Sequence, residues 1–102
     1  MHASIESRRN EVAQLCQRHG VSRLEVFGSA ARGDFDTERS DIDLLVQFGD
    51  SADADPLRSY FDLKGALEQL FGRSVDLVAA GAVRNPYVLA SINRHRQVMY
   101  AA

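Results

Sequence analysis

The sequence lacks tryptophan, has a single cysteine and contains no long apolar run. A lone Cys16 cannot form an internal disulfide, and no Cys/His spacing suggests zinc, so we expect a protein of the reducing cytoplasm. No stretch approaches the about 20 apolar residues that cross a bilayer. The first residues also lack the apolar core of a signal peptide. These absences argue against a secreted scaffold and against a membrane protein.

Charge and length narrow the class further. The sequence has 12 Lys and Arg against 14 Asp and Glu, a formal net charge of −2. This balance argues against a protein whose main task is to coat nucleic acid. The 102 residues, 45% of them hydrophobic, suffice for one globular domain over residues 1–102. They leave no room for a separate domain that binds an acceptor.

Two carboxylates on one strand are the first candidate for chemistry. Residues 42–48 alternate as a strand, which places Asp41 and Asp43 together on the face opposite Ile42 and Leu44. Two residues along a strand span about 6.5 Å. At that distance two negative charges repel by about 2 to 3 kcal/mol in a medium of effective dielectric about 20. A bound cation would relieve this repulsion.

A Gly-Ser turn is the second candidate. Residues 23–27 alternate as a strand that runs into Gly28. Ser29 is then placed to cap a helical turn at residues 30–32. The free backbone N–H groups at the start of such a turn attract phosphate, and glycine has no side chain that would block the approach.

A third strand, predicted at residues 74–78, adds another acid. Asp76 stands there between two apolar residues, as Asp43 does in its own strand. If the two strands are neighbours with their apolar faces aligned, Asp76 joins Asp41 and Asp43 on one side of the sheet.

Helical spacing and caps predict three helices around these strands. The first covers residues 5–19, the second begins at a cap on Asp55, and the third covers residues 85–96. A polar loop at residues 49–55 and a closing edge strand at residues 98–100 complete the chain. The buried positions of the helices are expected at Ile5, Val12, Leu15, Cys16; Leu57, Tyr60, Phe61, Leu67, Leu70, Phe71; and Val88, Leu89, Ile92.

Two segments together carry a resemblance to a known family. Residues 28–34 read Gly-Ser-Ala-Ala-Arg-Gly-Asp, and residues 40–43 read Ser-Asp-Ile-Asp. In residue type and spacing they resemble the motif of the nucleotidyltransferases of the DNA polymerase beta superfamily, and most closely that of the minimal one-domain (MNT) members. The resemblance implies an α/β fold with a small mixed β-sheet of three to four strands covered by helices.

The resemblance also implies a Mg²⁺-dependent enzyme that transfers AMP from ATP. Asp41 and Asp43 would bridge two Mg²⁺ ions, which stabilise the charge that develops during the transfer. Asp76 would hold the ion beside the acceptor oxygen, and lower the pKa of that oxygen or take its proton.

The phosphates of the nucleotide would lie at the Gly-Ser turn. Gly28 and Ser29 would hold the outer phosphates, and Arg32 would neutralise charge on the leaving group. A surface ion pair of Arg32 with Asp34 or Glu38 is the alternative interpretation.

Family members of this kind are typically antitoxins that are partnered with HEPN-domain ribonuclease toxins. The resemblance therefore implies a hetero-oligomer with such a toxin, and transfer of AMP to a tyrosine of it. One alternative is a binding module that neutralises the toxin by contact alone. Another is nucleotidyl transfer to a small molecule such as an aminoglycoside, but enzymes of that kind generally carry an additional substrate-holding domain.

Overall fold

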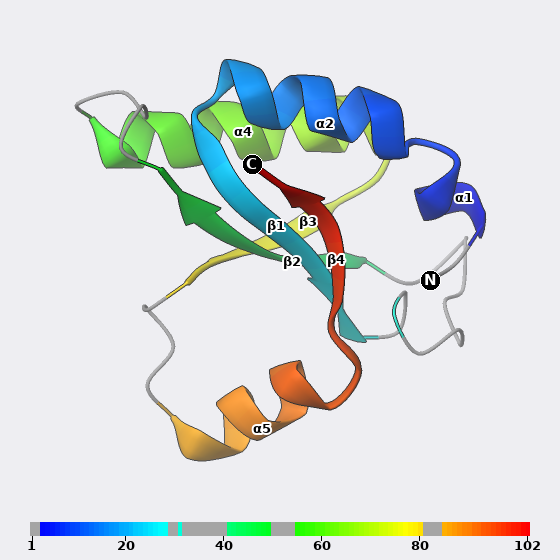
Figure 1. Cartoon of the computed structure of the whole chain (residues 1–102), viewed down its shortest axis with the longest axis vertical. Coiled ribbons are helices and arrows are strands. Elements are labelled where there is room, and N and C mark those ends of the chain that lie inside the picture. The colour runs from blue at the N-terminus through cyan, green and yellow to red at the C-terminus, as the bar shows by residue number, and fades with distance from the viewer. Residues whose placement is uncertain (1–2, 29–30, 32–40, 50–54, 81–84) are drawn as a thin grey trace.

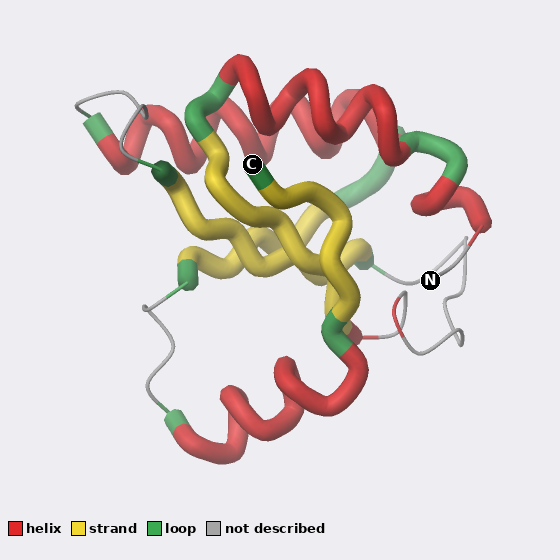
Figure 2. The backbone as a smooth tube through the Cα atoms, in the orientation of Figure 1, coloured by secondary structure: helices red, strands yellow, loops and turns green. Residues whose placement is uncertain are grey.

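A sheet with helices on both sides makes up the described part of the chain (Figures 1 and 2). The computed structural model describes residues 3–28, 31, 41–49, 55–80 and 85–102. Its elements are α1 (Ala3–Glu6), α2 (Arg9–Arg18), β1 (Val21–Phe27), β2 (Ile42–Phe48), α4 (Pro56–Phe71), β3 (Val75–Ala79), α5 (Pro86–His95) and β4 (Gln97–Ala101). The helix predicted at residues 5–19 is thus divided in two. Of the loop predicted at residues 49–55, residues 50–54 lie outside the described part.

The sheet is mixed. Its strand order is β3-β2-β1-β4, with β1 antiparallel to β2 and β4, and β2 parallel to β3. Parallel neighbours need a crossover connection, and α4 lies between β2 and β3 in the chain. This sheet of four strands confirms the predicted fold class.

One face of the sheet carries the hydrophobic core. α2 and α4 cover this face (Figure 1), and alternate residues of the central strands point toward them. Each large apolar side chain buried there contributes about 1.5 to 3 kcal/mol, so this packing holds the helices to the sheet. The side chains that are at most 1% exposed are Ile5, Val12, Cys16, Leu24, Val26, Ile42, Leu44, Val46, Leu63 and Leu67.

The opposite face of the sheet is different in composition. The residues that alternate with the core positions, Glu25 and Phe27 in β1 and Asp43 in β2, point to this side. α5 lies on the same side (Figure 1). Its Ile92 is 3% exposed, and it is buried separately from the cluster under α2 and α4.

Both ends of α4 are formed as the sequence predicts. At its start, the Asp55 carboxylate accepts a hydrogen bond from the Arg58 backbone N–H at 3.2 Å, with Pro56 in the first turn. At its end, Gly72 has a left-handed conformation with φ 67°, which a residue without a side chain adopts at little cost.

The predicted apolar face of α4 is partly wrong. Leu57 and Phe61 are 65% and 57% exposed, whereas Leu63, which the prediction omits, is fully buried. A helix turns by about 100° per residue, so Phe61 lies about 200° around the axis from Leu63. The helix buries the stripe of Leu63 and Leu67, and the two exposed side chains fall outside it.

α5 shows a similar difference. The Asn85 side chain caps it by accepting a hydrogen bond from the Tyr87 N–H at 2.9 Å, as predicted. Ile92 is buried as expected, but Leu89 is 39% exposed, so the prediction that Leu89 is buried is wrong. Figure 1 shows the start of α5 farther from the sheet than its end, which explains why the earlier residue is exposed. The side chain of Val88 lies outside the described ones.

Arg9 connects the N-terminal helices to the edge strand β4. Its Nε and Nη2 donate to the two carboxylate oxygens of Glu6 at 2.8 and 2.9 Å, and its Nη1 donates to the backbone oxygen of Met99 at 3.1 Å. The hydrogen bond from Arg9 lowers the pKa of Glu6, and the same bond raises the pKa of Arg9. This contact fixes the junction of α1 and α2 against the sheet.

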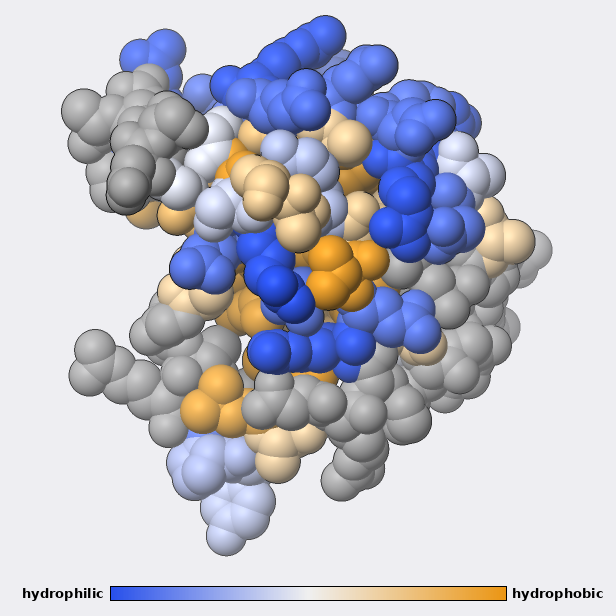
Figure 3. Space-filling model, in the orientation of Figure 1, coloured by the Kyte–Doolittle hydropathy of each residue, from blue (hydrophilic) through white to orange (hydrophobic). Residues whose placement is uncertain are grey.

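The outer surface of α2 is strongly polar (Figure 3). This is the pattern of a helix that is amphipathic and packs one side only. None of the described helices is both long and apolar enough to span a lipid bilayer.

Candidate active site

Asp43 and Asp76 occupy neighbouring positions on parallel strands. The β2/β3 register pairs these two residues directly. Register partners point to the same side of a sheet, and the apolar pairs before and after them are buried in the core. Both carboxylates therefore leave the sheet on the face away from α2 and α4. The prediction that the two strands are neighbours, with Asp76 on this side, is confirmed.

Asp41 directly precedes β2 and lies two residues before Asp43, about 6.5 Å along the chain. Asp41 and Asp76 are exposed, and Asp43 is half-buried. Within the described ranges, no group of three or more His, Cys, Asp or Glu side chains is placed to hold a metal ion together. The structure therefore pairs Asp43 with Asp76, but it does not gather Asp41 with them into a three-carboxylate metal site, as the sequence predicted.

Gly28 packs directly against the Asp43 carboxylate. It has φ +68°, and a Cβ at this position would overlap Asp43 Oδ2 and approach its Cγ to 3.1 Å. The register brings the two residues together, because Phe27, just before Gly28, pairs with Asp43. The sequence predicts a glycine that lets phosphate approach; the structure shows that a side chain at this position would displace the Asp43 carboxylate.

The turn after Gly28 is described at one position. Ala31 has a helical backbone and is 7% exposed within the core cluster, and residues 30 and 32 of the predicted helical turn lie outside the described ones. Ser29 and Arg32, the predicted phosphate-binding residues, lie outside the described residues. Their roles remain predictions.

The chemistry of the acids suits magnesium. Mg²⁺ prefers hard oxygen ligands, and proteins usually hold it with one or two carboxylates, the remaining ligands being phosphate oxygens and water. Asp43 and Asp76 provide carboxylate oxygens on one face of the sheet, and Asp41 is exposed two residues before Asp43. Gly28 leaves the space that the Asp43 carboxylate occupies. The residues present therefore fit Mg²⁺ that is bound jointly with a nucleotide.

A charged cluster that the local sequence pattern does not predict lies on the same face. Glu25 is 6% exposed and forms ion pairs with Arg23 at 2.9 Å and Arg96 at 3.0 Å. Alternation places Glu25 away from the core, but a local pattern does not reveal Arg96, which is 71 positions later in the chain (96 minus 25). The buried carboxylate becomes visible only when β4 is placed beside β1.

Two cavities of the described part are lined by none of the three acids. One of ≈ 490 Å³ separates α2 from α4 and is lined by Leu15, His19 and Leu70 among others. An apolar groove of ≈ 350 Å³ is lined by Phe48, Leu57, Tyr60 and Ala79 at the far end of β2. The acids thus stand on an exposed sheet surface and not inside either hollow.

Comparison with known sequences gives two findings. Residues 9–99 match the family model described as nucleotidyltransferase domain. A relative from Methanocaldococcus jannaschii, whose name describes it as a candidate protein adenylyltransferase, is 42% identical over 78 residues. The aligned part covers 76% of this chain and 76% of the relative.

Comparison with solved structures agrees. A structure described as that of a minimal nucleotidyltransferase candidate is 40% identical, with a TM-score of 0.73 over 91% of this chain and 90% of the other. A chain from the complex of a tri-AMPylated HEPN toxin of Shewanella oneidensis with an MNT antitoxin has a TM-score of 0.65. It is 17% identical and is aligned over 96% of this chain and 73% of its own length, so this second likeness concerns the fold alone.

Proposed function

The chain belongs to the family of nucleotidyltransferase domains, and on this basis we propose that it transfers AMP from ATP to a tyrosine hydroxyl of a HEPN-domain toxin and so acts as an antitoxin. The observation that carries the proposal is the pairing of Asp43 with Asp76, with Gly28 packed against the first of these carboxylates. The name of the relative supports a protein as the acceptor.

The proposed reaction exchanges one P–O bond for another. The acceptor oxygen attacks the α-phosphorus of ATP, the bond from that phosphorus to the bridging oxygen of the β-phosphate breaks, and pyrophosphate leaves. Two bound Mg²⁺ ions would supply positive charge against the charge that develops on the phosphates. Asp41, Asp43 and Asp76 would hold these ions, and Asp76, on the outer strand β3, would lower the pKa of the acceptor oxygen or accept its proton.

The other proposed contacts concern the phosphates. The backbone at Gly28 and Ser29, together with the Ser29 hydroxyl, would bind the outer phosphates. Arg32 would neutralise charge on pyrophosphate as it leaves. A reaction that consumes ATP is consistent with a cytoplasmic protein.

The test is direct transfer. The purified protein is mixed with MgATP and the HEPN-domain protein encoded next to its gene, and the intact mass of the toxin is followed with time. We expect the mass to rise by AMP units, and Asp43→Asn to slow this at least about a hundredfold, because one carboxylate that orders the phosphates is lost. Asp62→Asn is the matched control, since Asp62 is an exposed acid on α4. No adduct with the wild-type protein would contradict the proposal.

A second candidate function is neutralisation by contact alone. Large apolar side chains are exposed on α4 and α5, among them Phe61 at 57% and Tyr87 at 85%, and such side chains are common where proteins bind one another. In cells that express the toxin, Asp43→Asn combined with Asp76→Asn separates the two functions. Full protection by this double variant would favour contact, and loss of protection would favour transfer.

Transfer to an aminoglycoside is a third possibility. The mass-based transfer assay described above tests it with the drug as acceptor.

A further inference from the structure

The charged cluster around Glu25 has no part in the reaction proposed above. The Glu25 side chain is 7% exposed, and each of its carboxylate oxygens has its own arginine: Arg23 Nε lies 2.9 Å from Oε1, and Arg96 Nε lies 3.0 Å from Oε2. A carboxylate removed from water is costly unless it is paired and hydrogen-bonded. Two positive groups therefore hold one buried negative group on the catalytic face, which leaves the cluster with a net charge of +1.

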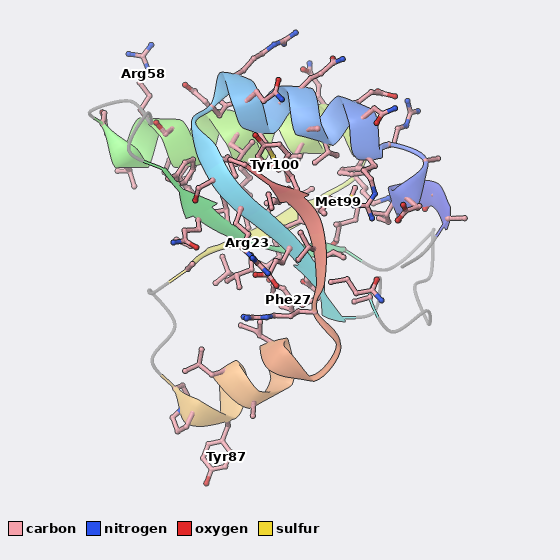
Figure 4. All side chains as sticks on the ribbon, viewed as in Figure 1. Arg23, Phe27, Arg58, Tyr87, Met99 and Tyr100 are labelled. Carbon is pink, nitrogen blue, oxygen red and sulfur yellow. The ribbon has the colours of Figure 1, made fainter. Side chains whose placement is uncertain are left out.

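The two arginines join different parts of the molecule. Arg23 lies on the same strand as Glu25, two residues earlier, and its ion pair therefore stays within β1. Figure 4 shows Arg23 and Phe27 on the side of β1 that faces α5. Arg96, by contrast, is the C-cap of α5 and directly precedes β4. The pair between Glu25 and Arg96 thus fastens the end of α5 to a central strand.

The strand register also brings Arg96 close to Asp43. Gln97 pairs with Val26 in the register of β1 and β4, so Arg96, one residue earlier, comes beside Phe27. Phe27 pairs with Asp43 in β2. Neighbouring strands are about 4.8 Å apart, so the backbones of Arg96 and Asp43 are separated by only about two strand spacings. α5 is the described helix that lies on this face of the sheet (Figure 1).

From this arrangement we infer that the ion pair between Glu25 and Arg96 is a positioning element that holds α5 as a side wall for the nucleoside part of the bound nucleotide. The inference rests on the proposed function. If the acids bind the phosphates, the nucleoside lies on the same open face, and α5 limits the space beside it. Arg96 acts through α5 and takes no part in the bond exchange.

The experiment compares Arg96→Gln with Arg23→Gln. Each variant removes one of the two arginines of the same carboxylate, but only the first releases α5. Hydrogen exchange of the full chain, followed by mass spectrometry, reports the opening of α5 without any nucleotide. Calorimetric titration with AMP-PNP and Mg²⁺ reports nucleotide affinity. In Arg96→Gln we expect faster exchange in α5 with unchanged exchange in β2, and an affinity for AMP-PNP about five- to tenfold weaker, because the wall is no longer held in place.

The control separates positioning from general loss of stability. Arg23→Gln should change the AMP-PNP affinity by less than about twofold and leave the exchange of α5 as in the wild type, while Arg96→Lys, which keeps the charge, should partly restore affinity. Unchanged α5 exchange in Arg96→Gln would overturn the inference, and so would faster exchange with unchanged affinity. A wild-type protein that does not bind AMP-PNP would overturn the proposed function and the role of α5 in nucleotide binding together. The exchange data would still show whether Arg96 holds the helix.

Discussion

The two faces of the sheet are stabilised in opposite ways. On the face under α2 and α4, tightly packed apolar side chains bury one another, and the central residues are at most 1% exposed. On the other face, a few specific contacts set the arrangement: Gly28 packs against Asp43, and Glu25 pairs with its two arginines. The first face should therefore respond to substitution with a loss of stability, and the second with a loss of function.

The largest effect on stability is expected on the core face of α4. Leu63→Ala should lower the free energy of unfolding by about 2 to 5 kcal/mol, because it opens a cavity among fully buried side chains. Phe61→Ala, on the exposed side of the same helix, should change it by less than about 0.5 kcal/mol. Urea unfolding followed by circular dichroism measures both. Equal losses would mean that Phe61 is packed in solution.

Gly28→Ala, beside the candidate site, and Gly72→Ala, at the end of α4, make a matched pair. Both glycines have a φ near +67°, so each substitution should cost about 1 to 2 kcal/mol of stability from backbone strain. Only at Gly28 does the added Cβ meet a carboxylate, whereas at Gly72 nothing lies within 4 Å. We expect Gly28→Ala to reduce AMP transfer about a hundredfold by displacing Asp43, and Gly72→Ala to retain the wild-type rate. An active Gly28→Ala variant would show that the position of this carboxylate is not critical.

A smaller effect on stability is expected at the start of α4, where a substitution removes one hydrogen bond and no packed core side chain. Asp55→Ala should cost about 1 kcal/mol, because the Arg58 N–H loses its capping acceptor. Asp62→Ala, which removes only an exposed ion pair with a separation of 3.8 Å, should have a much smaller effect. The midpoints of thermal unfolding of the two variants give the comparison. Equal midpoints would argue against the cap.

The last prediction needs no substitution, because the native Cys16 thiol on the core face serves as the probe. Burial raises the pKa of this thiol from 9.0 to about 12. The protonated thiol is therefore favoured by folding, so its contribution to stability is complete below pH 9 and is lost as the pH rises toward 12. At pH 8, iodoacetamide should alkylate the folded protein far more slowly than the protein in urea. Rapid alkylation of the folded chain would show that the core face opens readily.

Much of the fold could be predicted from local patterns. Alternation located the strands and assigned Asp43 and Asp76 to the side away from the core, and Asp55, Gly72 and Asn85 marked helix ends through their own backbone and side-chain chemistry. The errors have two causes. Leu57 lies outside the buried stripe of α4, and Leu89 lies where α5 is farther from the sheet; apolar spacing within a helix fixes neither the side that packs nor the distance to the sheet.

The sequence by itself determined the elements, their caps, the two-residue alternation of the strands and the acids that belong to the candidate site, because these depend on neighbours along the chain. Tertiary structure alone decided that Asp43 and Asp76 are register partners on neighbouring strands and that Gly28 packs against the Asp43 carboxylate. It also decided that the buried Glu25 pairs with Arg96. Each of these relations joins residues that come from different elements of the fold. Their geometry exists only after strand order and register are fixed by burial of the opposite face.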